Sequence, residues 1–192
     1  MNDTIERPQK IRIVGIIASG KTTLARRLSE RLGIPWHELD SVVYRSEGTE
    51  RYKRKPEEQR KLLEQIDRSG SWIFEGTDRS VHTFLYERAD AIIFLDPPLW
   101  KRRMRIVSRW IKQRTGREEC AYKPDLSILK LMFRWTRDFE RDRPRFEAKL
   151  DSYGAKVLRI TNTAEAERLL EIAWQPGPLH RTGKTIEKAG RK

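Results

Sequence analysis

Cysteine is almost absent from this sequence, since Cys120 is the only one among 192 residues. A single thiol cannot form a disulfide within the chain, which excludes the small disulfide-stabilised domains of secreted proteins. Histidine is also scarce, and the three histidines are scattered without the spacing of a metal site. We therefore expect a protein of the reducing cytoplasm.

Long apolar runs are missing as well. No stretch approaches the ~18 apolar residues that a membrane-spanning helix needs, and the first ten residues show no apolar segment typical of a secretory signal. The sequence thus predicts neither secretion nor a membrane partner. With 37% hydrophobic residues, the chain is long enough for one domain with a sizeable core.

Acidic residues are outnumbered, with 28 Asp and Glu against 41 Lys and Arg. Residues 101–149 hold 16 Lys and Arg against 7 Asp and Glu, and residues 175–192 hold 5 against 1. These two segments account for the whole net charge of +13. A basic block of this kind can bind the phosphates of a small ligand or of nucleic acid, and charge alone does not distinguish the two.

Five short apolar segments predict strands, and segments with apolar residues three or four apart predict helices between them. The strands are expected at 11–14, 35–40, 71–75, 91–95 and 156–160, and the helices at 21–32, 56–68, 98–114, 125–139 and 163–174. Apolar strands that alternate with helices are typical of a parallel sheet covered on both faces. We expect one domain over 1–174, followed by a basic, disordered tail over 175–192.

The segment 15–22 reads Gly-Ile-Ile-Ala-Ser-Gly-Lys-Thr and matches the pattern G-x-x-x-x-G-K-[ST] in full. It lies between a β-branched segment and an amphipathic helix, which is the context that a phosphate-binding loop requires. Its backbone amides and the helix N-terminus would bind phosphate oxygens. The predicted ATP-binding residues are Gly15, Ala18, Ser19, Gly20, Lys21, Thr22 and Thr23. The alternative is an ordinary glycine-rich turn.

From these residues the chain resembles the adenylate-kinase-like P-loop kinases, and most closely the bacterial DNA topology modulation proteins, also called FlaR-like. The resemblance runs from Lys10 to about Leu170. It implies a P-loop NTPase fold of the nucleoside-monophosphate-kinase type, with three α/β layers, a five-stranded parallel sheet and a small helical lid at about 110–125. Ala18 stands where these kinases usually have glycine, so its backbone must avoid a positive φ or the loop must shift.

The resemblance also assigns an acid and an arginine after the third strand. The segment 73–79, Ile-Phe-Glu-Gly-Thr-Asp-Arg, is similar to I-L-D-G-F-P-R of adenylate kinases. Glu75 stands at the acid that holds the hydration shell of Mg²⁺, and Arg79 at the arginine that binds the acceptor's phosphate. Asp96 is the alternative metal acid. Glu75 and Arg79 could instead form a surface ion pair four residues apart.

Asp40 ends the second predicted strand, and the carboxyl ends of parallel strands open onto the ligand crevice in folds of this class. A carboxylate there could act as general base toward an acceptor hydroxyl or help to orient Mg²⁺. The FlaR-like proteins show H-x-L-D at this place, which here is the segment 37–40. The alternative is an aspartate that caps the next turn.

The segment 105–109, Arg-Ile-Val-Ser-Arg, resembles R-I-V-G-R of adenylate kinase. Its two arginines are four residues apart and share one helical face. The resemblance implies that Arg105 lies on the nucleotide base side and that Arg109 contacts the transferring phosphates, whose negative charge fixed guanidinium groups stabilise.

These patterns predict a kinase that uses ATP and Mg²⁺ to phosphorylate a nucleotide, a nucleoside or another hydroxylated acceptor. The expected catalytic residues are Lys21, Asp40, Arg79, Arg105 and Arg109, and the expected metal-binding residues are Thr22 and Glu75. Two rival hypotheses remain: a nucleotide-dependent, DNA-associated regulator, which the basic block suggests, and an ATPase switch without an acceptor. The sequence specifies neither the acceptor nor the oligomeric state.

Overall fold

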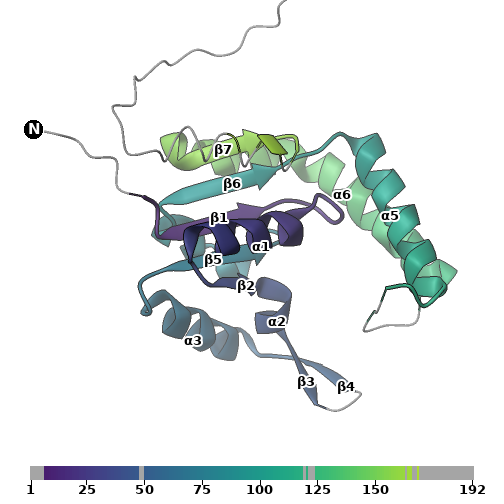
Figure 1. Cartoon of the computed structure of the whole chain (residues 1–192), viewed down its shortest axis with the longest axis horizontal. Coiled ribbons are helices and arrows are strands. Elements are labelled where there is room, and N and C mark those ends of the chain that lie inside the picture. The colour runs from purple at the N-terminus through teal and green to yellow at the C-terminus, as the bar shows by residue number, and fades with distance from the viewer. Residues whose placement is uncertain are drawn as a thin grey trace, which may run out of the picture.

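The computed structural model describes residues 7–47, 50–118, 120, 124–162, 164, 165 and 168. At its centre lies a five-stranded sheet in the order β2-β5-β1-β6-β7, in which every neighbouring pair is parallel (Figure 1). Its strands are β1 (Lys10–Val14), β2 (Trp36–Glu38), β5 (Trp72–Gly76), β6 (Ala91–Leu95) and β7 (Val157–Ile160). The predicted three-layer α/β fold with a five-stranded parallel sheet is confirmed.

The central strands alternate their side chains between two apolar faces of the sheet. One face packs against helix α1 (Lys21–Leu32). This cluster contains side chains from four strands and the helix, among them Ile11, Ile73, Ile93, Leu24 and Leu28. Because both faces are buried, the strands read as nearly continuous apolar runs in the sequence.

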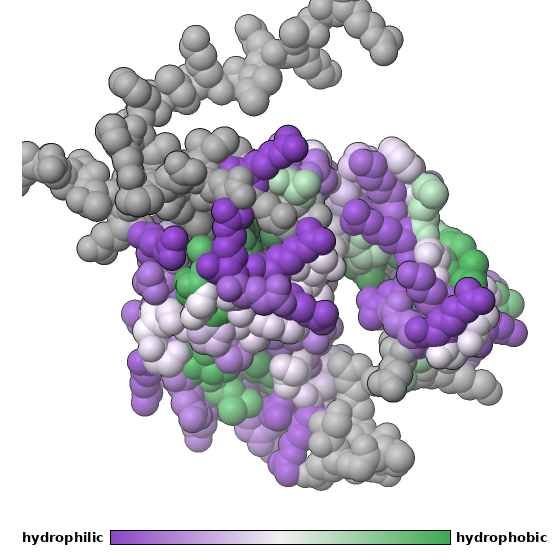
Figure 2. All heavy atoms as spheres, in the orientation of Figure 1, coloured by the Kyte–Doolittle hydropathy of each residue, from purple (hydrophilic) through white to green (hydrophobic). Residues whose placement is uncertain are grey.

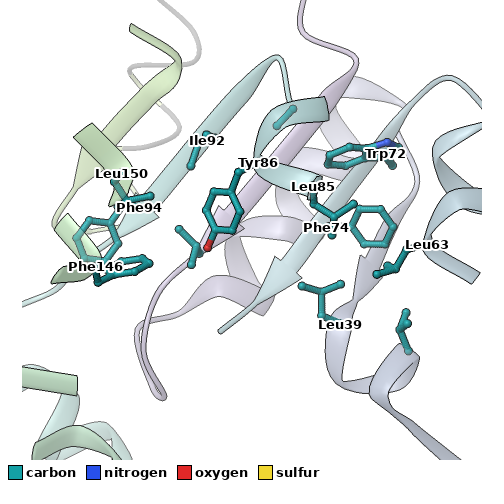
Figure 3. Close-up of a cluster of buried hydrophobic side chains, with 13 residues drawn as sticks. Leu39, Leu63, Trp72, Phe74, Leu85, Tyr86, Ile92, Phe94, Phe146 and Leu150 are labelled. Atoms are coloured by element: carbon teal, nitrogen blue, oxygen red, sulfur yellow. The ribbon is translucent and has the colours of Figure 1, made fainter. Parts of the chain in front are cut away.

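The other face is covered by α3 (Pro56–Asp67), α4 (Phe84–Arg88) and α6 (Leu126–Asp151). Its centre is rich in aromatic side chains, as Figure 3 shows for Trp72, Phe74, Tyr86, Phe94 and Phe146. The rings of Phe94 and Phe146 meet edge to face, with 5.2 Å between their centroids, a favourable geometry for aromatic pairs. This cluster joins α6 to the sheet.

Helices α5 (Leu99–Arg114) and α6 form a long hairpin beside the sheet (Figure 1). The predicted helix 125–139 ends too early, because α6 continues to Asp151. Pro144 removes one backbone hydrogen bond inside it, but the buried side chains of Phe146 and Leu150 anchor the turns that follow. The described residues of the predicted lid segment 110–125 lie at the tip of this hairpin, where Trp110 Nε1 donates to the Asp125 carbonyl oxygen over 2.9 Å.

Two further segments differ from the sequence-based expectation. The strand predicted over 35–40 is too long, because β2 ends at Glu38 and Asp40 lies in the short helix α2 (Leu39–Val43). Its buried residues are three and four apart, which is helical spacing. The sequence analysis also missed the antiparallel hairpin of β3 (Tyr44–Glu47) and β4 (Glu50–Lys53).

The described part of the chain also contains two single-turn 3₁₀ helices, η1 (Ser80–His82) and η2 (Gly154–Lys156). The helix predicted over 163–174 lies outside the described residues except at three positions, and the tail predicted over 175–192 lies wholly outside them. Among the helices of the described part, none is long and apolar enough to cross a membrane.

Candidate active site

The glycine-rich loop joins the end of β1 to the start of α1 at the carboxyl edge of the sheet. Gly15 is required because a Cβ there would lie 2.5 Å from the Leu95 carbonyl oxygen at the end of β6. Gly20 is the N-cap of α1 and has a left-handed φ of 103°, which glycine adopts without strain. Gly20 has no side chain to cap the helix, so the amides of the first turn of α1 are available to an anion.

Ala18 has a φ of 59°, so the first of the two alternatives expected for it, a backbone that avoids a positive φ, is wrong. An L-residue in this region places its Cβ close to the following carbonyl oxygen, which costs roughly 1–2 kcal/mol. Next to it, the Ser19 hydroxyl is buried and has no hydrogen-bond partner among the described residues. Strain and an unsatisfied hydroxyl therefore lie side by side in the loop.

Replacing Ala18 with glycine is expected to raise the free energy of unfolding by about 1 kcal/mol, because relief of the left-handed strain exceeds the added entropy of the unfolded chain. Urea denaturation measures this change. The matched control is Ala148→Gly on the exposed side of α6, which should lower the free energy of unfolding by about 1 kcal/mol. A destabilised Ala18→Gly protein would contradict the strain argument.

Lys21 is the first residue of α1, and its Nζ donates to the Ile16 carbonyl oxygen on the far side of the loop over 3.1 Å. Burial lowers the pKa of this ammonium group, and the nearby Glu75 carboxylate partly counteracts the effect. The side chain thus lies folded across the loop, within the electrostatic reach of the carboxylates at the ends of β2 and β5.

Thr22 and Glu75 are in direct contact, since the Thr22 hydroxyl donates to Glu75 Oε1 over 2.7 Å. Glu75 lies on β5 with 2% of its surface exposed, so the alternative of a surface ion pair with Arg79 is wrong. The pair presents a hydroxyl and a carboxylate oxygen, which are ligands suited to Mg²⁺. Within the described ranges, no three His, Cys, Asp or Glu side chains could hold a metal ion by themselves.

Asp40 and Arg79 also meet, with 2.7 Å between Arg79 Nη2 and Asp40 Oδ1. Asp40 follows β2, Arg79 follows β5, and these strands are neighbours in the sheet. Both side chains are partly exposed, and Asp40 is close enough to act on the Lys21 ammonium group. The structure therefore brings an acid and an arginine together beside the loop, although they are 39 residues apart in sequence.

A buried arginine that the sequence analysis missed lies beneath this pair. Arg12 points from β1 into the sheet face opposite α1 and is fully buried. Its guanidinium donates to the backbone carbonyl oxygens of Ile13, Phe74, Gly76 and Thr77, at 2.6 to 3.3 Å. It thereby holds the segment that leads to Arg79. The only sequence signal was a cation in the middle of an apolar strand.

Glu38 is a second residue that sequence reasoning missed. It is aligned with Glu75 in the parallel pairing of β2 and β5. Burial raises the pKa of Glu38, and the negative charges of Glu75 and Asp40 raise it further. The signal in the sequence was a second carboxylate two residues before Asp40. Three carboxyl groups thus lie at the edge of the sheet that faces Lys21.

Arg105 reaches from α5 to the loop, where its Nη1 donates to the carbonyl oxygens of Ser19 and Ala18 over 2.9 and 3.3 Å. Arg109 instead pairs with Glu118, with 3.0 Å between Nε and Oε1, and its positive charge acts on Glu38. The roles expected for the two arginines toward a nucleotide stay predictions. Their placement makes α5 one wall of the site.

Asp96 lies at the end of β6, and its carboxylate accepts hydrogen bonds from two arginines. Arg143 binds both of its carboxylate oxygens over 2.8 and 3.1 Å, and Arg159 binds one over 2.7 Å. Burial acts to raise the pKa of Asp96, but the hydrogen bonds from these arginines outweigh it and lower the pKa. Asp96 thus ties β6, α6 and β7 together, whereas Glu75 is the acid beside Thr22.

No protein-family model and no curated protein matches the chain. Among solved structures, the chain is similar to shikimate kinase from Acinetobacter baumannii in complex with shikimate. The identity is 15%, the match covers 85% of this chain and 91% of that chain, and the TM-score is 0.48.

Two other kinases are similar to the same degree. Deoxyadenosine kinase from M. mycoides is 15% identical over 85% of this chain and 95% of that chain, with a TM-score of 0.46. A gluconokinase from Sinorhizobium meliloti 1021 is 19% identical over 86% and 90%, with a TM-score of 0.44. At these values the likeness says nothing about what this chain acts on, so its function must be argued from its own side chains.

Proposed function

We propose that the chain is a kinase that transfers the γ-phosphoryl group of ATP to a hydroxyl group of a small acceptor. The observation that carries the proposal is the meeting of two side-chain pairs beside one loop. Thr22 contacts Glu75 and Asp40 contacts Arg79, each over 2.7 Å. The first pair suits the metal and phosphates, and the second suits an acceptor.

The loop suits a triphosphate for three reasons. Gly15 and Gly20 give it a backbone that larger residues would block or strain. The first turn of α1 has no acidic residue, so its amides attract negative charge. Lys21 lies across the loop and would exchange the Ile16 carbonyl oxygen for phosphate oxygens.

The donor set also fits Mg²⁺, since the Thr22 hydroxyl and the Glu75 carboxylate lie together and the ion would complete its shell with water and phosphate oxygens. When bound, Mg²⁺ neutralises charge on the phosphate oxygens. In this assignment Thr22 holds the ion directly and Glu75 holds its hydration shell. Glu38, beside Glu75 in the sheet, extends this acidic edge.

Asp40 is assigned as the general base. The acceptor oxygen forms a bond to the γ-phosphorus, the bond from that phosphorus to the β–γ bridging oxygen breaks, and the hydroxyl proton passes to Asp40. Arg79 orients the acceptor and stabilises the charge of the transferring group together with Lys21 and Arg105. The buried charge of Arg12 beneath Arg79 favours an acceptor that is itself anionic.

A substrate panel tests the proposal. Purified protein with ATP and Mg²⁺ is mixed with nucleotides, nucleosides, sugars and hydroxylated acids, and both ADP and the phosphorylated product are measured. We expect at least one acceptor to raise ADP formation and to yield its phosphate ester. Lys21→Ala, prepared in parallel, should lose the activity, which excludes a contaminating kinase. ADP formation that no acceptor changes would contradict the proposal and identify an ATPase switch.

The DNA-associated alternative rests on the basic charge alone, which does not distinguish nucleic acid from the phosphates of a small ligand. Of the fourteen Lys and Arg side chains of α5 and α6, five form ion pairs with described residues. These pairs are Arg102 with Glu140, Arg109 with Glu118, Arg141 with Asp138 and Asp142, Arg143 with Asp96, Glu140 and Glu147, and Lys149 with Asp78. The proposed kinase function uses part of the remainder, as Arg105 lies on the loop.

A further inference from the structure

Helix α5 exposes four hydrophobic side chains and buries two polar ones. Trp100 and Met104 are 59% and 63% exposed, and Val107 and Ile111 are exposed as well. The spacing of these four residues places them within an arc of about 60° and over about 17 Å of the helix. The opposite face buries Arg102, Ile106 and Gln113.

The reason for this orientation lies in the polar contacts of the buried face. The Arg102 side chain is 1% exposed, donates to the Pro97 carbonyl oxygen over 3.1 Å and pairs with Glu140 of α6. Arg105 is held on the loop backbone. These contacts set the rotation of α5 about its axis, so the apolar side chains, which we name the outer stripe of α5, cannot turn inward.

Cations line both edges of the outer stripe. At 100° per residue, Lys101 and Lys112 lie along one edge, and Arg103 and Arg114 along the other. The helix contains seven Lys and Arg and no acidic residue. In the described part of the chain, no carboxylate forms an ion pair with any of the four edge cations. Figure 2 shows hydrophobic surface at the outer side of the α5–α6 hairpin, next to hydrophilic areas.

We propose that the outer stripe of α5 docks onto an anionic lipid surface. An apolar stripe with tryptophan, flanked by lysine and arginine, is the pattern of a helix that lies in the membrane interface, with the cations reaching toward the headgroups. The stripe lies on a helix that runs beside the sheet (Figure 1), and its side chains are exposed, so a planar lipid surface meets it without needing a matching groove.

Other occupants fit the stripe less well. A second copy docked through the same face would bring two helices without acidic residues together, and the like charges would repel. Nucleic acid would use the cations but would leave the four apolar side chains without a role. The sequence predicted no membrane partner because it contains no spanning segment. A helix that lies on the surface needs none, and its outward face becomes visible only in the folded chain.

Co-sedimentation of the full-length protein with vesicles tests the proposal. Vesicles of phosphatidylcholine and phosphatidylserine are compared with vesicles of phosphatidylcholine alone, at low and high salt. We expect binding to the anionic vesicles that weakens with salt. The double variant Trp100→Ser, Met104→Ser, the stripe variant, should bind at least about tenfold more weakly. The double variant Arg103→Gln, Lys112→Gln, the charge variant, should bind roughly tenfold more weakly. The matched control Tyr52→Ser, at an exposed aromatic residue outside α5, should bind as the unmodified chain does.

Three outcomes would overturn the proposal. The first is no preference for anionic vesicles. The second is a stripe variant that binds vesicles normally while the charge variant does not, which would leave only nonspecific binding by the cations. In that case, a DNA mobility shift that the charge variant loses and the stripe variant keeps would indicate nucleic acid as the partner. The third is a dimer in analytical ultracentrifugation that the stripe variant loses. The altered side chains are exposed, so folding is preserved, and the kinase panel in lipid-free solution reports independently on the proposed function.

Discussion

Replacing Asp40 with asparagine is expected to lower kcat by about a hundredfold to ten-thousandfold, because an amide of the same shape cannot accept the acceptor's proton. The dissociation constant of ATP should change much less than kcat, since the hydrogen bonds of Lys21 and Thr22 do not involve Asp40, which acts on Lys21 through its charge. Steady-state kinetics with an acceptor from the panel gives kcat, and equilibrium titration gives the affinity for ATP.

Two controls separate chemistry from local structure. Asp142→Asn removes an exposed aspartate that pairs with Arg141, and it should leave kcat unchanged. Asp40→Asn also removes the charge that faces Arg79, so Arg79→Gln is measured beside it. We expect Arg79→Gln to raise the acceptor KM, whereas Asp40→Asn acts on kcat. An Asp40→Asn protein with full kcat would show that another group, or none, takes the proton.

The free energy of unfolding is expected to fall by about 3 kcal/mol between pH 7 and pH 4 because of His82. Its ring is fully buried, and Nε2 lies 3.2 Å from Gln59 Oε1. The Gln59 amide nitrogen donates to the Arg54 carbonyl oxygen, so its oxygen accepts from His82. Burial, together with the positive charges of Arg12 and Arg79, lowers the pKa of His82 from 6.5 to about 4.

The sign follows from which state binds the proton. Well above pH 6.5 histidine is neutral in both states and contributes nothing to the pH dependence. As the pH falls from 6.5 to about 4, His82 binds a proton in the unfolded chain but stays neutral in the folded chain. The unfolded state is therefore stabilised relative to the folded state.

Urea denaturation at several pH values measures this loss, with His82→Gln as the comparison. Glutamine keeps a donor for Gln59 but does not titrate. The variant is expected to lose less stability on acidification, whatever its stability at pH 7. Equal losses in the two proteins would assign the effect to carboxylates instead.

Local patterns predicted the parts of the site that lie within one stretch of chain. The loop and the helix after it are specified by consecutive residues, because the conformation of the loop depends on the glycines, small residues and lysine within the segment itself. The positions of the strands followed from continuous apolar runs. Near Asp40 the same reasoning predicted too long a strand. The three apolar residues Leu39, Val42 and Val43 after the short strand are equally compatible with the turn of helix that formed.

Contacts between distant segments could not be predicted in this way. Whether Glu75 or Asp96 approaches Thr22 depends on which neighbours compete for each carboxylate, and Arg143 and Arg159 come from α6 and β7. The length of α6 was misjudged for a related reason. Pro144 is a poor helix residue, and only the packing of Phe146 and Leu150 beneath it keeps the helix intact.

The sequence by itself determined that the chain folds as alternating strands and helices around a parallel sheet, with a glycine-rich loop at the end of the first strand. These features depend on periodicity and on backbone freedom, which are local properties. Only the tertiary structure decided which acid faces the loop, that Arg12 lies buried beneath Arg79, and that α5 points its apolar side outward. Each of these depends on competition between groups far apart in the chain, because burial and pairing are settled only when the elements pack together.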